Sequence, residues 1–161
     1  MDFSIREIEK TDNETIRQVI RTVLEEHSVT MPGTAYYDDS LNHMFESYTG
    51  GNKIYYLGII DGKIVGGAGI FPTEGLPADT CELVKMYLLP QARGLGLGKA
   101  LVNKCLDFAT AHGYKKVYLE TMPELQNAVH MYEKMGFNLL KGPMGNTGHF
   151  ACTLRMLKNI S

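Results

Sequence analysis

The sequence predicts one mixed α/β domain over residues 1–161. Three observations support this class: short alternating apolar segments that are typical of strands, longer apolar patterns at helical spacing, and glycine or proline where these segments end. No linker-like stretch, internal repeat or low-complexity tract divides the chain. We therefore expect a single domain that is long enough to bury a hydrophobic core.

The N-terminal part is expected to form a strand, a helix, a loop and a second, short helix. Residues 3–8 alternate between apolar and polar side chains, as a strand does. Residues 11–27 place apolar side chains at helical spacing, and Thr11 and Glu14 have the spacing of a capping box at its start. Residues 41–48 repeat the helical pattern over a shorter stretch and predict a short helix.

An antiparallel hairpin is expected in the middle of the chain. Residues 53–60 and 63–70 flank Asp61-Gly62, a dipeptide that favours the two-residue turn of a tight hairpin. The glycines within residues 63–70 are interpreted as permitting close backbone packing. A third strand over residues 81–89 stops before Pro90.

Helix and strand alternate in the C-terminal part. Apolar side chains repeat at helical spacing from Gly96 until Gly113, which ends the helix. We expect a strand over residues 115–121, a helix over 124–137 and a last strand over 148–157.

The stretch "QARGLGLGKA", residues 91–100, joins a strand to a helix through glycines at every second position. The N–H groups of a first helical turn have no partner within the helix, and the helix dipole adds positive potential there. Glycines at 94, 96 and 98 would let the backbone approach phosphate oxygens, with Arg93 and Lys99 as neutralising charges. The spacing predicts a phosphate or pyrophosphate ligand but fits neither a P-loop nor GxGxxG. The alternative is a turn that only packs the helix against the strand.

Two blocks, "ELVKMYLLPQARGLGLGKALV" and "NAVHMYEKMGF", resemble the GNAT superfamily of acetyl-CoA-dependent N-acetyltransferases. The signature of this superfamily has the form R/Q-x-x-G-x-G/A, and Arg93, Gly96 and Gly98 match it. The resemblance follows the order of elements from about Ile5 to Leu157. It implies a GNAT-type fold: a central, mixed, mostly antiparallel sheet, splayed beside the strand at 82–89 and flanked by helices.

The resemblance also implies acetyl-CoA as the cofactor. Backbone groups of Met86 and Leu88 would contact the pantetheine arm together with Asn127, and the amides of residues 93–99 would hold the pyrophosphate. The cofactor-binding residues implied in this way are Met86, Leu88, Arg93, Gly94, Leu95, Gly96, Leu97, Gly98, Lys99 and Asn127.

The implied reaction is direct attack of an amine on the thioester in a ternary complex. An amine of lysine type has an ordinary pKa of about 10.4 and must lose a proton before it attacks, so a nearby carboxylate is useful. Glu82 occupies a position where family members often carry a basic glutamate, and strand periodicity places it on the face of Val84 and Met86. The alternative is a surface or buried structural carboxylate.

Tyr132 occupies the family's tyrosine position in the second block and would donate a proton to the departing CoA thiolate. The alternative is a core tyrosine on an amphipathic helix. The neighbouring Asn127 and Gly136-Phe137 favour the catalytic role.

Composition argues against several other classes of protein. The net charge of −2 comes from 16 basic and 18 acidic residues without a basic block, so no nucleic-acid partner is expected. No apolar run reaches about 18 residues, so no membrane partner is expected either. Cys81, Cys105 and Cys152 are odd in number and lack CxxC spacing, which suits the reducing cytoplasm.

The histidines show no metal-ligand spacing, so no metal site is expected. His149 is expected to begin the last strand near the acceptor, where it would be either an auxiliary base or a solvated loop histidine.

The expected partner is a small-molecule or peptide amine, and a homodimer is compatible with this reading. Acidic and aromatic side chains near the N-terminal helices would favour a cationic amine or else form a solvated face. These residues are Glu25, Glu26, Tyr36, Tyr37, Asp38, Asp39 and Glu46. The alternative to an enzyme is a non-catalytic acyl-CoA binding or sensing module.

Overall fold

The computed structural model describes residues 2–161 and contains a seven-stranded sheet in the order β1-β2-β3-β4-β5-β7-β6. All neighbouring strands are antiparallel except β4 and β5, which are parallel. The strands are β1 Phe3–Glu7, β2 Ile54–Ile60, β3 Lys63–Phe71, β4 Thr80–Leu88, β5 Lys116–Thr121, β6 Asn138–Leu139 and β7 Leu154–Asn159. The mixed, mostly antiparallel sheet implied by the family resemblance is confirmed.

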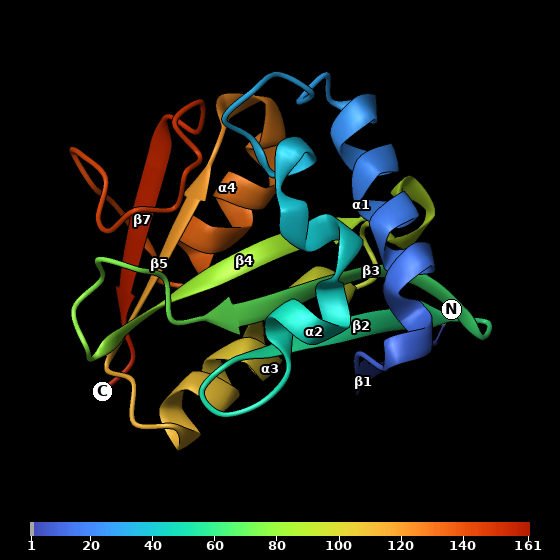
Figure 1. Ribbon diagram of the computed structural model, residues 1–161, viewed down its shortest axis with the longest axis horizontal. Helices are drawn as coiled ribbons and strands as arrows, with labels where there is room; N and C mark the ends of the chain where they lie inside the picture. Colours follow the sequence, from blue (N-terminus) through green and yellow to red (C-terminus); the bar gives the residue numbers. More distant parts are fainter. Residues whose placement is uncertain (1) are drawn as a thin grey trace.

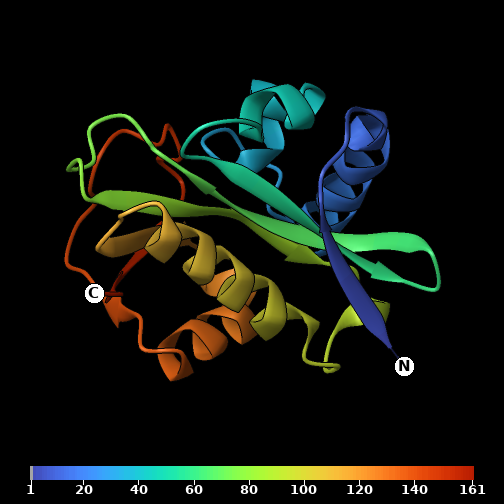
Figure 2. The ribbon, with the colours of Figure 1, turned by 90° about the horizontal axis from the view of Figure 1, so that it is seen from below.

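Helices cover both faces of the sheet (Figure 1). They are α1 Asn13–Glu26, α2 Met44–Tyr48, α3 Leu97–Ala111 and α4 Gln126–Lys134. The view from below shows α1 and α2 on one face and α3 and α4 on the other (Figure 2). Among residues 2–161, no helix is long and apolar enough to cross a bilayer.

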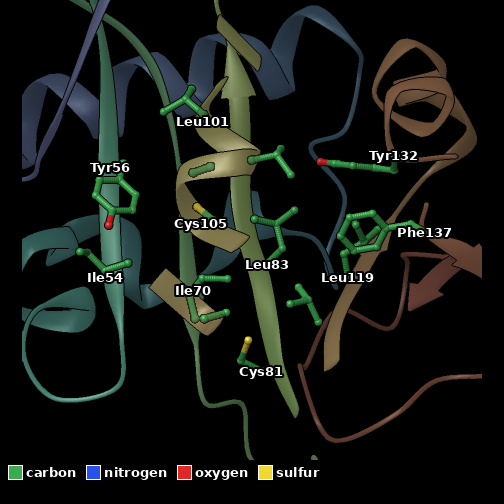
Figure 3. Packing of buried hydrophobic residues seen from close by; sticks show 14 of the residues in the cluster. Ile54, Tyr56, Ile70, Cys81, Leu83, Leu101, Cys105, Leu119, Tyr132 and Phe137 are labelled. Carbon is green, nitrogen blue, oxygen red and sulfur yellow. The ribbon is translucent and has the colours of Figure 1, made fainter. Parts of the chain in front are cut away.

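Two hydrophobic cores result, one on each face of the sheet. The apolar stripe of α1, which includes Ile16 and Ile20, is buried on one face. On the other face, Leu101 and Cys105 of α3 pack over Leu83 and its neighbours in the sheet (Figure 3). Full burial of one large aliphatic side chain contributes about 1.5–3 kcal/mol, so these stripes hold the helices to the sheet.

The sheet splays open between β4 and β5. β4 pairs with β3 as far as Leu88, but with β5 only over Thr80–Glu82. The two strands diverge beyond this point, so one edge of the second half of β4 is left without a partner strand. This is the splay that the family resemblance implies.

A bulge in β4 changes which side chains share a face. Lys85 has φ 48°, and the register with β3 shifts there, because Tyr87 lies opposite Gly67 and Val84 lies opposite Gly69. Beyond the bulge the alternation is reversed. Val84 packs in the core beneath α1, whereas Met86 packs on the opposite face. The prediction that Met86 shares the face of Glu82 is therefore wrong.

Several boundaries differ from the predicted ones at the N-terminal side of the chain. The capping box at Thr11 and Glu14 is wrong, because the carboxylate of Asp12 instead accepts from the Glu9 N–H at 2.7 Å and pairs with Arg6 at 2.8 Å. The short helix predicted over 41–48 is divided into a 3₁₀ turn, Asp39–Asn42, and α2.

The last strand begins later than predicted. Residues 148–153 form a loop in which the Cys152 N–H donates to the His149 oxygen at 3.0 Å, and β7 starts at Leu154. His149 consequently lies before the strand and not in it. The two-residue strand β6 had no recognisable pattern in the sequence.

Candidate active site

A cleft of about 620 Å³ opens beside the unpaired part of β4. Its walls come from β4, the glycine turn, the first turns of α4 and the end of α1. Of the residues implied as cofactor-binding, those that line it are Met86, Leu88, Arg93, Gly94, Gly96, Gly98, Lys99 and Asn127. Leu95 and Leu97 do not line it, and Leu97 is fully buried in the core.

Sequence reasoning missed several further lining residues, among them Tyr87, Gln126 and Met131. Met131 follows Asn127 by four positions on α4, so helical spacing from Asn127 was an available signal. The contribution of Tyr87 depends on how β4 is bulged and splayed, which no local pattern indicates.

The glycines of the turn serve two different purposes. Gly94 and Gly96 have φ of 77° and 86°, and a Cβ at either position would meet open space. Glycine is favoured at these two positions because the backbone there is left-handed, a conformation that other residues rarely adopt. A Cβ on Gly98 would lie 2.9 Å from the Met86 Cε, so this glycine lets α3 approach β4 closely. At Gly98, therefore, the glycine serves to pack the helix against the strand, which was the alternative to phosphate binding.

The first turn of α3 begins beside the cleft and has free amides. The Ala100 N–H donates to the Gly96 oxygen at 3.0 Å and makes the first bond of the helix. The amides of Leu97, Gly98 and Lys99 precede this bond and have no partner in the part of the chain that the structure describes. Unpartnered amides and the helix dipole both favour a negative charge at this position.

Arg93 is engaged in the protein itself. Its guanidinium pairs with both carboxylate oxygens of Glu26 at 2.8 Å and donates to the Leu88 oxygen at 2.9 Å. The hydrogen bonds from Arg93 lower the pKa of Glu26. The Arg93 amide already donates to the Pro90 oxygen. The free amides of this turn thus begin after Arg93, and its side chain ties α1 to the end of β4.

A second, smaller cavity of about 40 Å³ lies near Glu82. Loop residues including Val29 and Cys152 close it, and Tyr87 and Leu125 line both this cavity and the cleft. The two spaces therefore share a wall at the splay.

Glu82 is buried in this second cavity with 5% of its surface exposed. Burial raises the pKa of its carboxyl to about 7, and a hydrogen bond from the Thr73 hydroxyl opposes part of that rise. A carboxyl with this pKa can accept and release a proton near neutral pH.

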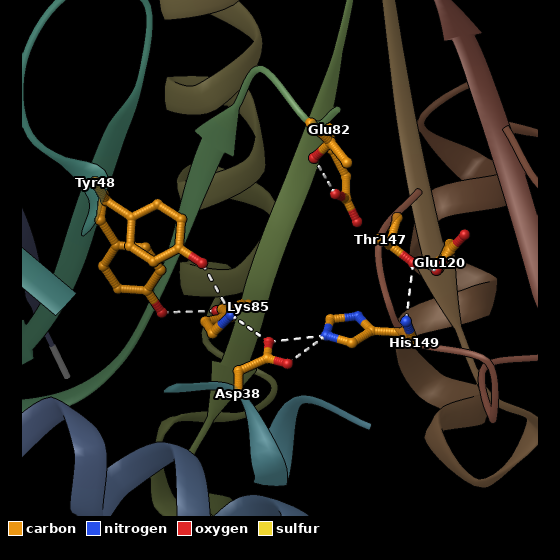
Figure 4. A network of polar contacts seen from close by, with 9 residues as sticks. Asp38, Tyr48, Glu82, Lys85, Glu120, Thr147 and His149 are labelled. Atoms are coloured by element: carbon orange, nitrogen blue, oxygen red, sulfur yellow. Dashed lines mark hydrogen bonds and ion pairs between the residues drawn. The ribbon is translucent and has the colours of Figure 1, made fainter. Parts of the chain in front are cut away.

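Other charged groups surround Glu82 (Figure 4). Lys85 donates to Asp38 at 2.7 Å and to the Tyr48 hydroxyl at 2.8 Å. Asp38 also binds His149 Nε2 at 2.8 Å. The sequence predicted that Asp38 lies near the N-terminal helices, either beside the acceptor or on a solvated face. In the structure it instead bonds to Lys85 and His149, which are both distant from it in the chain.

Glu120 is a further member of this group. It accepts hydrogen bonds from the hydroxyls of Thr147 and Tyr118, the latter at 2.5 Å. Glu120 and Lys85 were missed by sequence reasoning, because their environment depends on the meeting of β4, β5 and the loop before β7.

Comparison with known proteins identifies the family. The profile of the Acetyltransferase (GNAT) family matches residues 18–137. The chain is also 38% identical over 157 residues to the uncharacterized N-acetyltransferase YjgM of Escherichia coli K12, over 97% of this chain and 94% of that protein. This chain belongs to the GNAT acetyltransferase family. It is accordingly an acyltransferase.

Solved structures agree on the fold of this GNAT acetyltransferase. A GNAT-family acetyltransferase of Staphylococcus aureus MU50 superposes with a TM-score of 0.88 at 20% identity, over 99% of this chain and 100% of that chain. The PaiA N-acetyltransferase of Thermoplasma acidophilum, solved with coenzyme A, superposes with a TM-score of 0.76 at 19% identity and 99% coverage of each chain. At these identities the similarity establishes the GNAT-type fold.

Tyr132 of this GNAT acetyltransferase is buried on α4 beside Phe137, with ring centroids 5.7 Å apart. Its hydroxyl points from α4 toward β4 (Figure 3). Burial raises its pKa above the ordinary range, so the hydroxyl keeps its proton at neutral pH. The side chain lines neither cavity.

Proposed function

We propose that this protein transfers an acetyl group from acetyl-CoA to an amine. The observation that carries this proposal is the arrangement at the splay: a long cleft that includes free helix amides shares a wall with a small cavity that holds a buried carboxyl. A nucleotide cofactor in the cleft and an acceptor in the cavity would meet beside β4. The PaiA N-acetyltransferase, which shares this fold, was solved in complex with coenzyme A, and this supports an acyl-CoA as the co-substrate here.

The cofactor would lie along the whole cleft. Its pyrophosphate would accept hydrogen bonds from the amides of Leu97, Gly98 and Lys99, where the helix dipole favours negative charge. The pantetheine arm would run beside the unpaired edge of β4 at Met86, with Asn127 on the opposite wall. This orientation points the thioester toward Tyr87 and the second cavity.

The reaction forms one bond and breaks another. The amine nitrogen attacks the thioester carbonyl and forms the N–C bond, after which the C–S bond breaks. Glu82 takes the proton that the amine loses, because its pKa of about 7 leaves it partly ionised near neutral pH. We propose Tyr132 as the donor of the proton that the thiolate takes up, although its side chain lines neither cavity in this structure. The products are an amide and CoA.

Thiol release from acetyl-CoA in the presence of a panel of primary amines tests this proposal. We expect one or more amines to release CoA thiol at a rate that rises with enzyme concentration, and calorimetry to detect CoA binding. CoA binding without turnover over the whole panel would favour the non-catalytic module. Absence of CoA binding would overturn the cofactor assignment.

A further inference from the structure

Three side chains that can ligate a metal ion converge in the second cavity. Glu82 comes from β4, Glu120 from β5 and His149 from the loop before β7. One oxygen of each carboxylate and one ring nitrogen of the imidazole all lie within 4.8 Å of one another. The expectation of no metal site rested on spacing along the chain, and such spacing cannot detect ligands that come from separate elements.

Glu82 offers one carboxylate oxygen to this cavity. Only 5% of its surface is exposed, and the Thr73 hydroxyl donates to its Oε1. Oε2 is therefore the oxygen left for a ligand, and Figure 4 shows the carboxylate directed toward the side of Glu120 and His149. A charged oxygen in such a buried place costs free energy, which a bound cation would recover.

Asp38 orients the imidazole for metal binding. Both of its oxygens lie close to His149 Nε2, at 2.9 and 2.8 Å, and its ion pair with Lys85 shows that it is a carboxylate. Nε2 therefore carries the proton, which leaves a lone pair on Nδ1. Nδ1 lies on the side of the ring that faces Glu82 and Glu120 (Figure 4). A carboxylate that accepts from the far nitrogen is the usual support of a metal-binding histidine.

Glu120 is also held from outside the group of three. The Tyr118 hydroxyl donates to its Oε2 at 2.5 Å, and the Thr147 hydroxyl donates to its Oε1. Each of these oxygens keeps a second lone pair for a metal. All three side chains are thus oriented by residues that would not themselves touch the ion.

Glu82 and Glu120 have no cationic partner of their own. No ion pair in residues 2–161 includes either carboxylate. Lys85, the nearby cation on β4, is already bound to Asp38. Two adjacent carboxylates in a site of low dielectric repel each other, and a divalent cation between them would offset this repulsion.

The size of the site suits a small transition-metal ion. Ligand atoms about 2.1 Å from Zn²⁺ in a tetrahedron are roughly 3.4 Å apart, so no pair has to close by more than about 1.4 Å. The cavity of about 40 Å³ has room for the ion and one or two waters. One imidazole nitrogen with carboxylate oxygens suits Zn²⁺ or Co²⁺, whereas Mg²⁺ and Ca²⁺ prefer oxygen ligands alone.

The geometry points to a binding site for a divalent transition-metal ion, formed by Glu82, Glu120 and His149, with Asp38 as a positioning residue. Three protein ligands leave the fourth position of the ion to water. This inference goes beyond the proposed function and does not depend on it. Because the ion would occupy the carboxyl that the proposed reaction uses as its base, a bound ion would inhibit acetyl transfer.

A titration with cobalt(II) chloride tests the site without requiring turnover. We expect one equivalent of Co²⁺ to give saturable visible absorption bands, and one equivalent of Zn²⁺ to remove them. Zn²⁺ should shift the ¹⁵N signal of His149 Nδ1 more than that of Nε2. It should also raise the melting temperature, because it binds the folded protein.

Variants assign the ligands and the positioning residue. Glu120→Gln should weaken Co²⁺ binding at least about tenfold, and Asp38→Asn about 10- to 100-fold, as loss of an outer partner commonly does. Metal-free Asp38→Asn should also carry its imidazole proton on Nδ1. His130→Asn and Glu133→Gln change exposed side chains on α4 and are the matched controls, with unchanged affinity.

Thr147→Val is a second test that keeps all three ligands. It removes one donor to Glu120 and should weaken Co²⁺ about tenfold, even if Glu120→Gln proves too unstable to titrate.

Several outcomes would overturn the site. They are the absence of a saturable band up to millimolar Co²⁺, wild-type affinity in both Glu120→Gln and Thr147→Val, and loss of binding in His130→Asn or Glu133→Gln, which would show adventitious binding at the surface. An unchanged tautomer in folded Asp38→Asn would remove the positioning role. Failure of the amine panel to release thiol counts against the proposed function alone.

Discussion

Lys85 and Asp38 form an ion pair with a 2.7 Å separation between Nζ and Oδ2, although 47 positions separate them in the chain. The side chain of Lys85 is only 4% exposed and that of Asp38 is 23% exposed. Burial lowers the pKa of Lys85, but Tyr48 and Asp38 outweigh this effect and raise it, so the lysine stays charged. The pair joins the bulge of β4 to the loop before α2, and both residues depend on each other to remain ionised inside the protein.

Lys85→Met should therefore destabilise the fold. Removal of one member of a buried pair leaves the other charge poorly compensated, and we expect a loss of about 3 kcal/mol in the free energy of unfolding. Urea denaturation measures this value. Lys63→Met changes an exposed strand lysine and serves as the control, with an expected change within about 0.5 kcal/mol. If Lys85→Met unfolds like the control, the ion pair contributes nothing to stability.

Glu82 should make stability depend on pH in an unusual direction. Its pKa rises from an ordinary 4.5 to about 7, so the folded protein holds this proton more tightly than the unfolded chain. The resulting stabilisation is complete below pH 4.5 and is lost as pH rises through 7. Glu82→Gln removes this pH-dependent stabilisation. As pH rises from 4.5 to above 7, the free energy of unfolding of the variant should therefore increase relative to wild type by up to about 3 kcal/mol.

Urea denaturation of both proteins at several pH values between 4.5 and 8 measures this difference. Glu133→Gln on the surface of α4 is the control and should show no pH-dependent difference. A constant difference between Glu82→Gln and wild type would show that the carboxyl titrates alike in the folded and unfolded states.

Gly96→Asp should weaken CoA binding. The substitution adds a side chain and a negative charge at the amides that would hold the pyrophosphate, and we expect affinity to fall at least about tenfold. Calorimetric titration with CoA measures it. Gly96→Asn has the same left-handed backbone without the charge, and Gly113→Asp places the charge at another open glycine with φ 83°. Equal affinity in Gly96→Asp and these controls would place the pyrophosphate elsewhere.

Tyr132→Phe distinguishes an acid from a packing residue. The change keeps the ring and removes the only donor, so turnover should fall about 10²- to 10⁴-fold if the hydroxyl protonates the thiolate. CoA affinity and melting temperature should change little. Tyr56→Phe alters another buried tyrosine in the same core and is the matched control. Wild-type turnover in Tyr132→Phe would assign proton donation to water or another group.

Local sequence patterns predicted the helices and strands well where buried side chains recur at the regular spacing of a helix or a strand. The hairpin at Asp61-Gly62 is confirmed, with both residues at positive φ as its turn type requires, and β4, α3 and α4 lie within a few residues of their predicted ranges. The glycine turn could also be predicted, because free amides and left-handed backbone arise within a few neighbouring residues. Together with the family resemblance, these patterns determined the fold and the place of the cleft in which we propose that the cofactor binds.

The surroundings of Glu82 were decided by tertiary structure. The bulge at Lys85 moved Met86 to the other face, since strand periodicity holds only while the register with β3 is unbroken. Asp38, Glu120 and His149 meet because strands and loops from distant parts of the chain close over Glu82. The raised pKa of Glu82 likewise comes from burial by those segments. Periodicity and turn chemistry act between near neighbours, whereas charge pairing and desolvation depend on which distant segments pack together.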